Sequence, residues 1–106
     1  MPVSNVTNIA FIRAKARQSE ELGRRLLALV EPSRQEPGCI NYDLHRSADD
    51  PDSWCVYENW RSAGDLAAHF ALPHMQDFIT RVPALVEGEL DLRRFAMIST
   101  PAPWRF

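Results

Sequence analysis

Apolar residues along the chain follow two alternating spacings, which predict strands and helices in turn. Residues 6–14 (VTNIAFIRA) are rich in β-branched and aromatic residues and predict a first strand. Leucines and a valine then recur at helical spacing after Ser19, which we expect to cap the helix and which two glutamates follow in the first turn. This helix is expected to end before Pro37 and Gly38, because that pair does not continue a helix.

The middle of the chain predicts an antiparallel hairpin. Residues 39–46 and 53–60 alternate between apolar and polar, and the six residues between them are rich in aspartate and proline, which form turns. Pairing of Arg46 with Ser53 gives one face that carries Ile40, Tyr42, Leu44, Cys55, Tyr57 and Asn59. The other face then carries Asn41, Asp43, His45, Trp54, Val56, Glu58 and Trp60. Neither face has the polar character of a solvated sheet surface.

The second half of the chain predicts two short helices and a last strand. Ser62 and Asp65 match a capping motif that opens a helix through Phe70. Pro73 is suited to the first position of a further helix, whose apolar residues again follow helical spacing. Residues 90–99 return to a strand pattern and predict the last strand of the chain.

The order βαββαβ is that of ferredoxin-like α+β domains, in which helices cover one face of an antiparallel sheet. We expect residues 1–99 to form one such domain and residues 100–106 to form an extended tail. Because both predicted sheet faces carry apolar and aromatic residues, we expect a homodimer that buries one face of each sheet against the partner. Trp104 and Phe106 of the tail are expected to dock on the partner as well.

Composition limits the class of protein and its partners. The chain has 106 residues, 45% of them apolar and 25% charged, which is enough for one hydrophobic core without disulfides. A net charge of −2 does not favour nucleic acid or an anionic membrane as a partner. We see neither a membrane-spanning apolar run nor a secretory leader, and therefore expect a cytoplasmic protein. Cys39 and Cys55 are expected to be small core residues.

The residues that can carry chemistry do not form a recognisable metal or nucleotide motif. His69 and His74 are five apart with Pro73 between them, which is not the spacing of a helical metal site, so we expect no metal. Glycine-rich phosphate-binding loops are absent as well. What remains is a polar and aromatic set near a predicted cavity: Asn8, Asn41, Trp60, His69, His74, Phe78 and Arg93.

Members of this set also have purely structural interpretations. Trp60 fits a core position, His69 fits a half-exposed helical position, and His74 fits a cap on its own helix. Arg93 needs an anion where it points inward, and Glu58 is its expected partner. The residue pattern alone leaves these structural roles and the functional ones open.

Three segments of the chain match a known pattern in order and spacing. They are residues 36–39 (EPGC), 57–60 (YENW) and 65–78 (DLAAHFALPHMQDF). Together they resemble the antibiotic biosynthesis monooxygenase family, over about residues 6–98. The H-x-x-x-P-H-M part of the last segment is especially similar to bacterial quinol monooxygenases.

The resemblance implies a dimeric α+β barrel in which two sheets face each other. It also implies oxygenation of an electron-rich phenol or quinol by O₂ without metal, haem or flavin. Such chemistry is plausible because a deprotonated quinol passes an electron to O₂ directly, so the protein has to desolvate, orient and deprotonate it.

Single positions refine what the resemblance implies. Trp60 matches a pocket tryptophan of relatives that oxidise aromatic polyketides, whereas Val56 stands where those relatives have an asparagine. Ile79 stands near the position of the iron-binding histidine of haem-degrading relatives, so haem degradation is not implied. Relatives that process the autoinducer-2 signal share the helix histidine pattern, which keeps an isomerase open.

We therefore expect a cofactor-independent monooxygenase that acts on a quinol or a hydroxylated aromatic with O₂. Its expected catalytic residues are His74, His69, Trp60 and Asn8, and its expected substrate-binding residues are Phe78, Asn41, Arg93 and Glu58. His74 is the expected base or substrate-positioning donor, because histidine titrates near neutral pH and the preceding proline fixes the backbone. The alternatives are a protein that binds a small aromatic metabolite without turnover, and an autoinducer-2-type isomerase.

Overall fold

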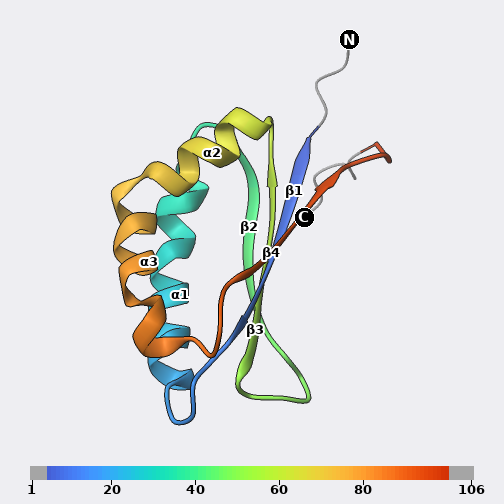
Figure 1. Cartoon of the computed structure of the whole chain (residues 1–106). Coiled ribbons are helices and arrows are strands. Elements are labelled where there is room, and N and C mark those ends of the chain that lie inside the picture. The colour runs from blue at the N-terminus through green and yellow to red at the C-terminus, as the bar shows by residue number, and fades with distance from the viewer. Residues whose placement is uncertain (1–4, 101–106) are drawn as a thin grey trace.

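The computed structural model describes residues 5–100 and confirms the predicted order of elements (Figure 1). The elements are β1 (Val6–Arg13), α1 (Ser19–Arg34), β2 (Cys39–Arg46), β3 (Ser53–Trp60), α2 (Ala63–Ala71), α3 (Pro73–Leu85) and β4 (Asp91–Ala96). Residues 101–106 of the expected tail, Trp104 and Phe106 included, lie outside the described residues. The arrangement is the ferredoxin-like α+β fold, with two consecutive helices between β3 and β4.

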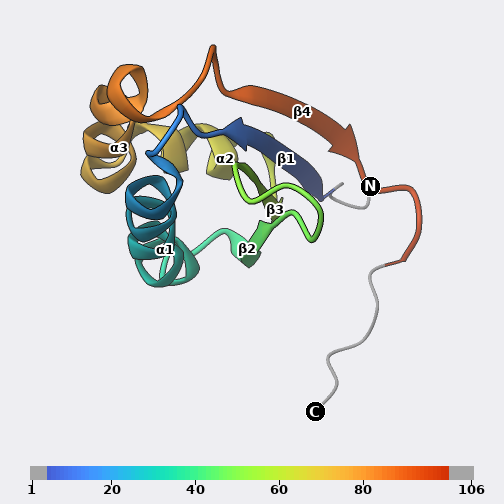
Figure 2. The same ribbon diagram turned by 90° about the horizontal axis from the view of Figure 1, so that it is seen from below.

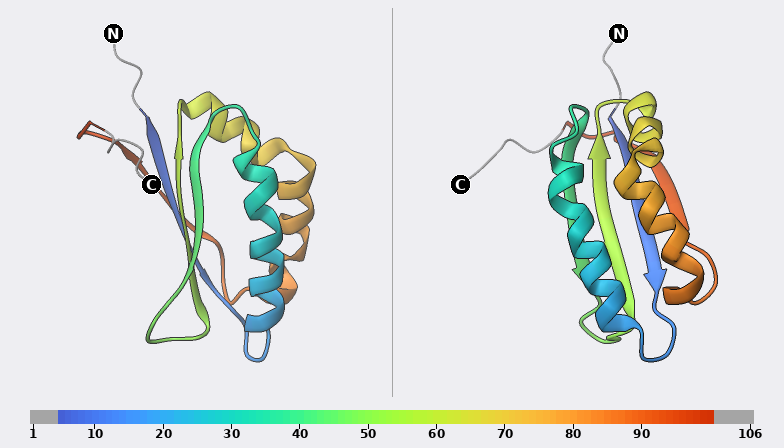
Figure 3. Two further views of the ribbon diagram at one scale, coloured as in Figure 1. Left: turned by 180° about the vertical axis from the view of Figure 1, so that it is seen from behind. Right: turned by 90° about the vertical axis from the view of Figure 1, so that its left-hand side faces the viewer.

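The four strands form one antiparallel sheet in the order β2-β3-β1-β4. All three helices lie on the same side of this sheet, and α1 and α3 run side by side (Figures 2 and 3). Within residues 5–100 no element covers the opposite face of the sheet. β4 is an edge strand, and all six of its residues are exposed.

The predicted hairpin register was wrong by one residue. Arg46 pairs with Trp54 rather than with Ser53, which places Tyr42 opposite Glu58. Because side chains alternate between the two faces of a sheet, this slip reverses the faces of β2 relative to β3. From Asn41 onwards, the even-numbered residues of β2 therefore face the helices together with the even-numbered residues of β3, and the odd-numbered residues face the other side. A register shift between Cys39 and Asn41 places Cys39 opposite Trp60, on the helix side.

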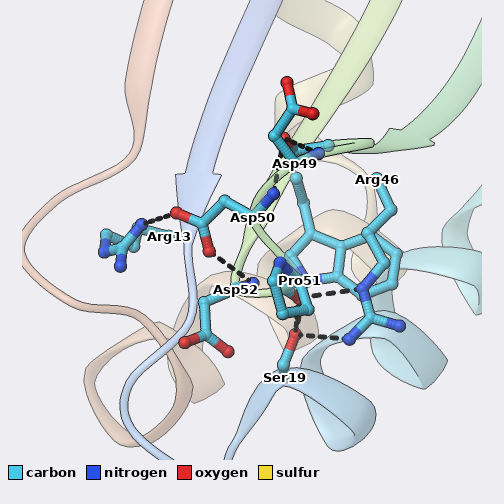
Figure 4. A network of polar contacts seen from close by, with 9 residues as sticks. Arg13, Ser19, Arg46, Asp49, Asp50, Pro51 and Asp52 are labelled. Carbon is cyan, nitrogen blue, oxygen red and sulfur yellow. Dashed lines mark hydrogen bonds and ion pairs between the residues drawn. The ribbon is translucent and has the colours of Figure 1, made fainter.

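Contacts of the hairpin loop with distant elements explain the register. The carbonyl of Pro51 accepts hydrogen bonds from Ser19 Oγ at 2.6 Å and from Arg46 Nε at 2.8 Å (Figure 4). Arg13 Nη1 lies 2.6 Å from Asp50 Oδ2. These partners lie on α1, β1 and β2, so the alternation of residues within the hairpin does not reveal where the loop ends.

Helix α1 buries one face against the sheet, as its spacing predicts. Leu22, Leu26 and Leu29 are at most 5% exposed and share the core with Ile12 and Val56 of the sheet. Burial of a leucine side chain stabilises a fold by about 1.5–3 kcal/mol. This stripe therefore fixes α1 over the sheet and leaves its other face to solvent.

The two cysteines do not share one environment. Both are free and half-buried, and Cys39 packs against the core as expected. Cys55 is an odd-numbered residue of β3 and lies on the face away from the helices, so its expected core position was wrong. Burial raises the pKa of the Cys39 thiol to about 11, which keeps it protonated near neutral pH.

A break in the helical layer positions two histidines. Leu72 has extended dihedrals and is at once the end of α2 and the residue before α3, because a residue that precedes proline avoids the helical region. Pro73 then occupies the first turn of α3. His69 at the end of α2 and His74 at the start of α3 have ring centres only 6.0 Å apart.

A close approach of backbone brings a third residue to this break. A Cβ on Gly38 would lie 2.3 Å from Cγ of Asp65, so the chain before β2 passes directly against the start of α2. The carbonyl of Gly38 also accepts a hydrogen bond from the N–H of Arg61 at 2.9 Å. This path carries Glu36, two residues earlier, to the two histidines.

The start of α2 depends on one side chain, which gives a first prediction. Ser62 Oγ accepts a hydrogen bond from the N–H of Asp65 at 3.0 Å, and removal of such a cap costs about 1 kcal/mol. We expect Ser62→Ala to lower the free energy of unfolding by that amount in urea denaturation. Ser62→Thr, which keeps the hydroxyl, is the matched control. Equal stability of the alanine variant and the wild type would contradict the role of this cap.

Candidate functional site

A narrow cavity lies between the helix-facing side of the sheet and the helices. Its walls are mostly apolar, and its polar side chains are Asn8, Tyr42 and Glu58, one from each of β1, β2 and β3. The space available to a water-sized sphere is about 20 Å³, which suffices for about one water molecule. Among the described residues that line it, Leu92 is exposed and Phe70 and Leu90 are half-buried, so these three mark its open side.

Glu58 is the charged group of this cavity. It is 2% exposed, and its Oε1 accepts a hydrogen bond from Nε1 of Trp60 at 2.8 Å. Burial raises the pKa of the Glu58 carboxyl from 4.5 to about 7, and the indole N–H of Trp60 and the nearby amide of Asn8 oppose part of that effect. The carboxyl therefore changes its charge near neutral pH, where general acid–base chemistry operates.

Asn8 brings an unsatisfied amide to the same cavity. It is 0% exposed and pairs with Glu58 in the register of β1 and β3. Neither Nδ2 nor Oδ1 has a hydrogen-bond partner among the described residues. A buried polar group without a partner destabilises a fold by about 1–3 kcal/mol. Its amide therefore offers both a donor and an acceptor to a molecule in the cavity.

Glu36, His69 and His74 form a compact cluster beside the cavity. Oε2 of Glu36 lies 2.8 Å from Nδ1 of His69 and 3.0 Å from Nε2 of His74. The side chains of His69, Glu36 and His74 are 0%, 9% and 24% exposed, so the cluster runs from the interior towards solvent. One oxygen of Glu36 thus lies within hydrogen-bond distance of both imidazoles.

His69 also connects this cluster to Glu58. Its Nε2 has no hydrogen-bond partner among the described residues and lies 4.0 Å from Oε1 of Glu58. Its ring packs against the ring of Trp60 with centres 4.6 Å apart. Burial lowers the pKa of His69, which the nearby Glu36 opposes in part, so the imidazole stays neutral at pH 7.

The cluster has the residue types that hold a divalent metal ion. Its three ligand atoms lie within 4.8 Å of one another, and two histidines with a carboxylate are a set that zinc and iron accept. The sequence argument against a metal rested on the separation of His69 and His74 along one helix. The break at Pro73 removes that basis, because it turns both rings towards Glu36. In the structure one oxygen of Glu36 is hydrogen-bonded to Nδ1 of His69 and to Nε2 of His74.

The structure brings together most residues that the sequence selects. Asn8, Glu58 and Phe78 line the cavity. Trp60 is fully buried and joins Glu58 to His69 by its contacts. His69 is also fully buried rather than half-exposed, and with His74 it lies next to the lining rather than in it.

Asn41 and Arg93 lie elsewhere. Both are on the sheet face away from the helices, where Asn41 Nδ2 donates to Asp43 Oδ2 at 3.1 Å. Arg93 pairs with Asp91 at 2.8 Å and lies over the ring of Phe11. The predicted salt bridge of Arg93 with the cavity glutamate was therefore wrong, because the two side chains leave opposite faces of the sheet.

Sequence reasoning missed Glu36 and Tyr42 as parts of the site. Glu36 stands in the EPGC segment, and only the approach of the chain at Gly38 to α2 places it against the histidines. Tyr42 was assigned to the other face by the wrong register, although it is 3% exposed and lines the cavity. Its burial raises the pKa of the phenol, so Tyr42 remains neutral.

The structure is thus an α+β domain in which helices cover one side of an antiparallel sheet and a small cavity is lined by a buried carboxyl and an unsatisfied amide. The family model described as "Antibiotic biosynthesis monooxygenase" matches residues 5–81, so the chain belongs to this family. The resemblance seen in the three sequence segments is thereby confirmed.

Individual relatives agree with this assignment. "Putative monooxygenase Rv0793" of Mycobacterium tuberculosis is 33% identical, over 94% of this chain and 92% of the relative. The crystal structure of PA3566 from Pseudomonas aeruginosa superposes with a TM-score of 0.88 at 32% identity, over 93% of this chain and 99% of that one.

A relative from Synechocystis, sll1783, is longer than this chain. The two sequences are 29% identical over 84% of this chain, and the matched part covers 60% of the length of sll1783.

Among residues 5–100, no helix combines the length and the hydrophobicity that a membrane crossing requires.

The titration of Glu58 gives a second prediction. The pKa of Glu58 is about 7 in the folded protein and 4.5 in the unfolded chain. Between these two pH values the folded protein holds a proton that the unfolded chain has lost, so the free energy of unfolding falls as the pH rises. Glu58→Gln removes this loss and keeps an oxygen for the Trp60 N–H. We expect it to unfold like the wild type at pH 4.5 and to be more stable by up to about 3 kcal/mol at pH 8.

Denaturation of both proteins across this pH range is the measurement, because the difference between them cancels titration of the other groups. A stability difference that does not change with pH would contradict the raised pKa of Glu58. His69, whose lowered pKa acts with the opposite sign, is present in both proteins.

Proposed function

We propose that this protein is a monooxygenase that oxidises a quinol or a hydroxylated aromatic compound with O₂, without metal, haem or flavin. Membership of the antibiotic biosynthesis monooxygenase family and the name of the mycobacterial relative support the reaction class. The cavity supports the proposed substrate class, because its walls are apolar apart from three groups that can hydrogen-bond a phenolic oxygen.

The proposed reaction balances without a further reductant. A hydroquinone and O₂ give a hydroxyquinone and water: one oxygen atom enters the ring, and the other leaves as water. The substrate supplies all four electrons, two through its oxidation to the quinone and two through conversion of a C–H to a C–OH group. The protein then has to bind the ring, orient it, exclude water and take a proton.

The observation that carries this proposal is the unsatisfied amide of Asn8 beside the carboxyl of Glu58. Asn8 Nδ2 can donate to a substrate oxygen, and the Glu58 carboxylate can accept its O–H. Both groups lie in a region from which water is nearly excluded, where such hydrogen bonds are strong. An aromatic ring with a hydroxyl matches apolar walls and this pair of polar groups at the same time.

The cavity must open for a substrate to enter. Its volume of about 20 Å³ holds no more than about one water molecule, whereas an aromatic ring is several times larger. Phe70, Leu90 and Leu92, which are the described lining residues that are not fully buried, can move outward at the least cost in buried surface. We propose that the ring enters on the side that these three residues form.

The cavity does not favour the isomerase alternative. Recognition of a phosphorylated ketone calls for arginine or lysine at the binding site, and none of the described residues that line the cavity is either. Arg93 lies on the opposite face of the sheet.

Oxygen consumption tests the proposed reaction and gives a third prediction. A reduced quinol should make the wild type consume O₂ faster than the autoxidation blank. Asn8→Leu should lower kcat/KM about tenfold or more, because the substrate loses a hydrogen bond in a buried site. The free energy of unfolding of the same variant should be about 1–2 kcal/mol higher than that of the wild type, because the substitution removes an unsatisfied buried amide.

Gln35→Leu, an amide replaced at an exposed position on the helix side, is the control and should retain activity. A wild-type rate equal to the blank, together with quinol binding measured by calorimetry, would identify a binding protein and refute the monooxygenase. An active Asn8→Leu variant would refute the role of this amide.

We also propose that the protein is a homodimer whose partner covers the sheet face away from the helices. Phe11 and Tyr57 on this face are each 39% exposed and Phe95 is 52% exposed. β4, the edge strand, is exposed along its whole length. Exposed aromatic side chains gathered on one sheet face are typical of an interaction surface.

The dimer gives a fourth prediction. Sedimentation of the wild type should give about twice the chain mass of 12.1 kDa. Replacement of Tyr57 and Phe95 by aspartate should shift the protein towards the monomer, because the charges would be buried at the interface. Leu27→Asp, on the exposed side of α1 at 64% exposure, is the matched control and should remain dimeric. A wild-type monomer at micromolar concentration refutes the proposal.

A further inference from the structure

We infer that Glu58 is the base that takes the substrate's hydroxyl proton, and that His69, Glu36 and His74 carry this proton from the cavity to solvent. The inference rests on the proposed function. It assigns separate tasks to the cavity carboxyl and to the cluster behind it.

The position of the groups favours Glu58 over His74 as the base. Glu58 lines the cavity and is 2% exposed, whereas His74 does not line it and has its Nε2 engaged with Glu36. A general base must come within hydrogen-bond reach of the proton that it takes. His74 meets solvent instead, with 24% of its side chain exposed, which suits the last member of a proton route.

The hydrogen bonds define the direction of the route. His69 is neutral, so one ring nitrogen carries a proton and the other carries a lone pair. With its Nδ1–H donated to Glu36 Oε2 at 2.8 Å, its lone pair is on Nε2, the atom that faces Glu58 and has no partner among the described residues. An unpartnered acceptor thus lies next to the group that becomes an acid after reaction.

Each step transfers one proton and changes no oxidation state. The substrate O–H bond breaks and the proton joins the Glu58 carboxylate. Glu58 then protonates Nε2 of His69, whose Nδ1 proton passes to Glu36. Glu36 passes its proton to the lone pair of His74 Nε2, in the tautomer that carries its proton on Nδ1, and His74 releases the Nδ1 proton to solvent. The step from Glu58 to His69 spans 4.0 Å, so the carboxyl has to move by about 1 Å to form a hydrogen bond.

The surroundings of Glu58 make this route specific. The titratable groups near it are Tyr42 and Cys39 of β2, His69 of α2 and Glu36, and burial keeps both the phenol and the thiol protonated. α1 and α3 contribute only apolar residues to the cavity lining. Among these groups His69 is the neutral acceptor. The pKa of Glu58, about 7, allows it to accept a proton and return it near neutral pH.

The test is the pH dependence of kcat for quinol oxidation in the wild type and four variants. We expect Glu58→Gln to lose about 10²–10⁴-fold in kcat and to lose the rise of kcat through pH 7. Glu58→Asp, which keeps a shorter carboxyl, should recover part of the activity. His74→Gln should show a smaller loss, which imidazole added as a mobile proton carrier restores. His45→Gln, at an exposed position of β2, is the control and should match the wild type.

Each outcome decides a separate question. A wild type that consumes O₂ while Glu58→Gln keeps its rate and pH profile overturns the base and leaves the proposed function intact. A loss in His74→Gln that imidazole does not restore overturns the route. Abolition of wild-type activity by a chelator, with recovery on addition of zinc or iron, would mean that the cluster holds a metal and would overturn the route as well. A wild-type rate equal to the blank removes both the proposed function and this inference.

Discussion

The pairing of β1 with β3 places Asn8 and Glu58 opposite each other beneath the helices, and the character of the site depends on this register. In a core of leucine, methionine and phenylalanine, an unsatisfied amide and a carboxyl that has to lose or hold a charge both oppose folding. The hydrogen bond from Trp60 relieves the carboxyl only in part, since its pKa remains well above the ordinary range. Stability given up in this way, at a cavity, is typical of a site that binds or transforms a ligand.

The helix break at Pro73 determines what stands behind this pair. An uninterrupted helix would turn residues five apart to different sides, so His69 and His74 would not share one carboxylate. The extended conformation of Leu72 changes the helix direction. Because Gly38 has no side chain, the chain segment that carries Glu36 can pass close to the start of α2. Two local features of backbone, a proline and a glycine, thus build a cluster whose members come from three parts of the chain.

The sequence predicts those features that depend on local spacing. The order of elements, the stripe of leucines on α1, the cap at Ser62 and the helix start at Pro73 all follow from such patterns and are found in the structure. The hairpin register does not follow from them, because contacts of the loop with α1 and β1 determine it. That single slip moved Tyr42 to the wrong face. It also hid that Asn41 leaves the sheet on the side away from the cavity.

The edge strand β4 connects the proposed dimer to the proposed reaction. Its Leu92 lines the cavity, although the strand as a whole is exposed in the single chain. Phe95 and Arg93, its neighbours on the other face, lie over the side of the sheet where the partner is proposed to pack. A partner that fixes this strand would limit how far Leu92 can move, and so how the cavity opens. Because entry of an aromatic ring requires such movement, the rigidity of one edge strand links the association of two chains to access of the substrate.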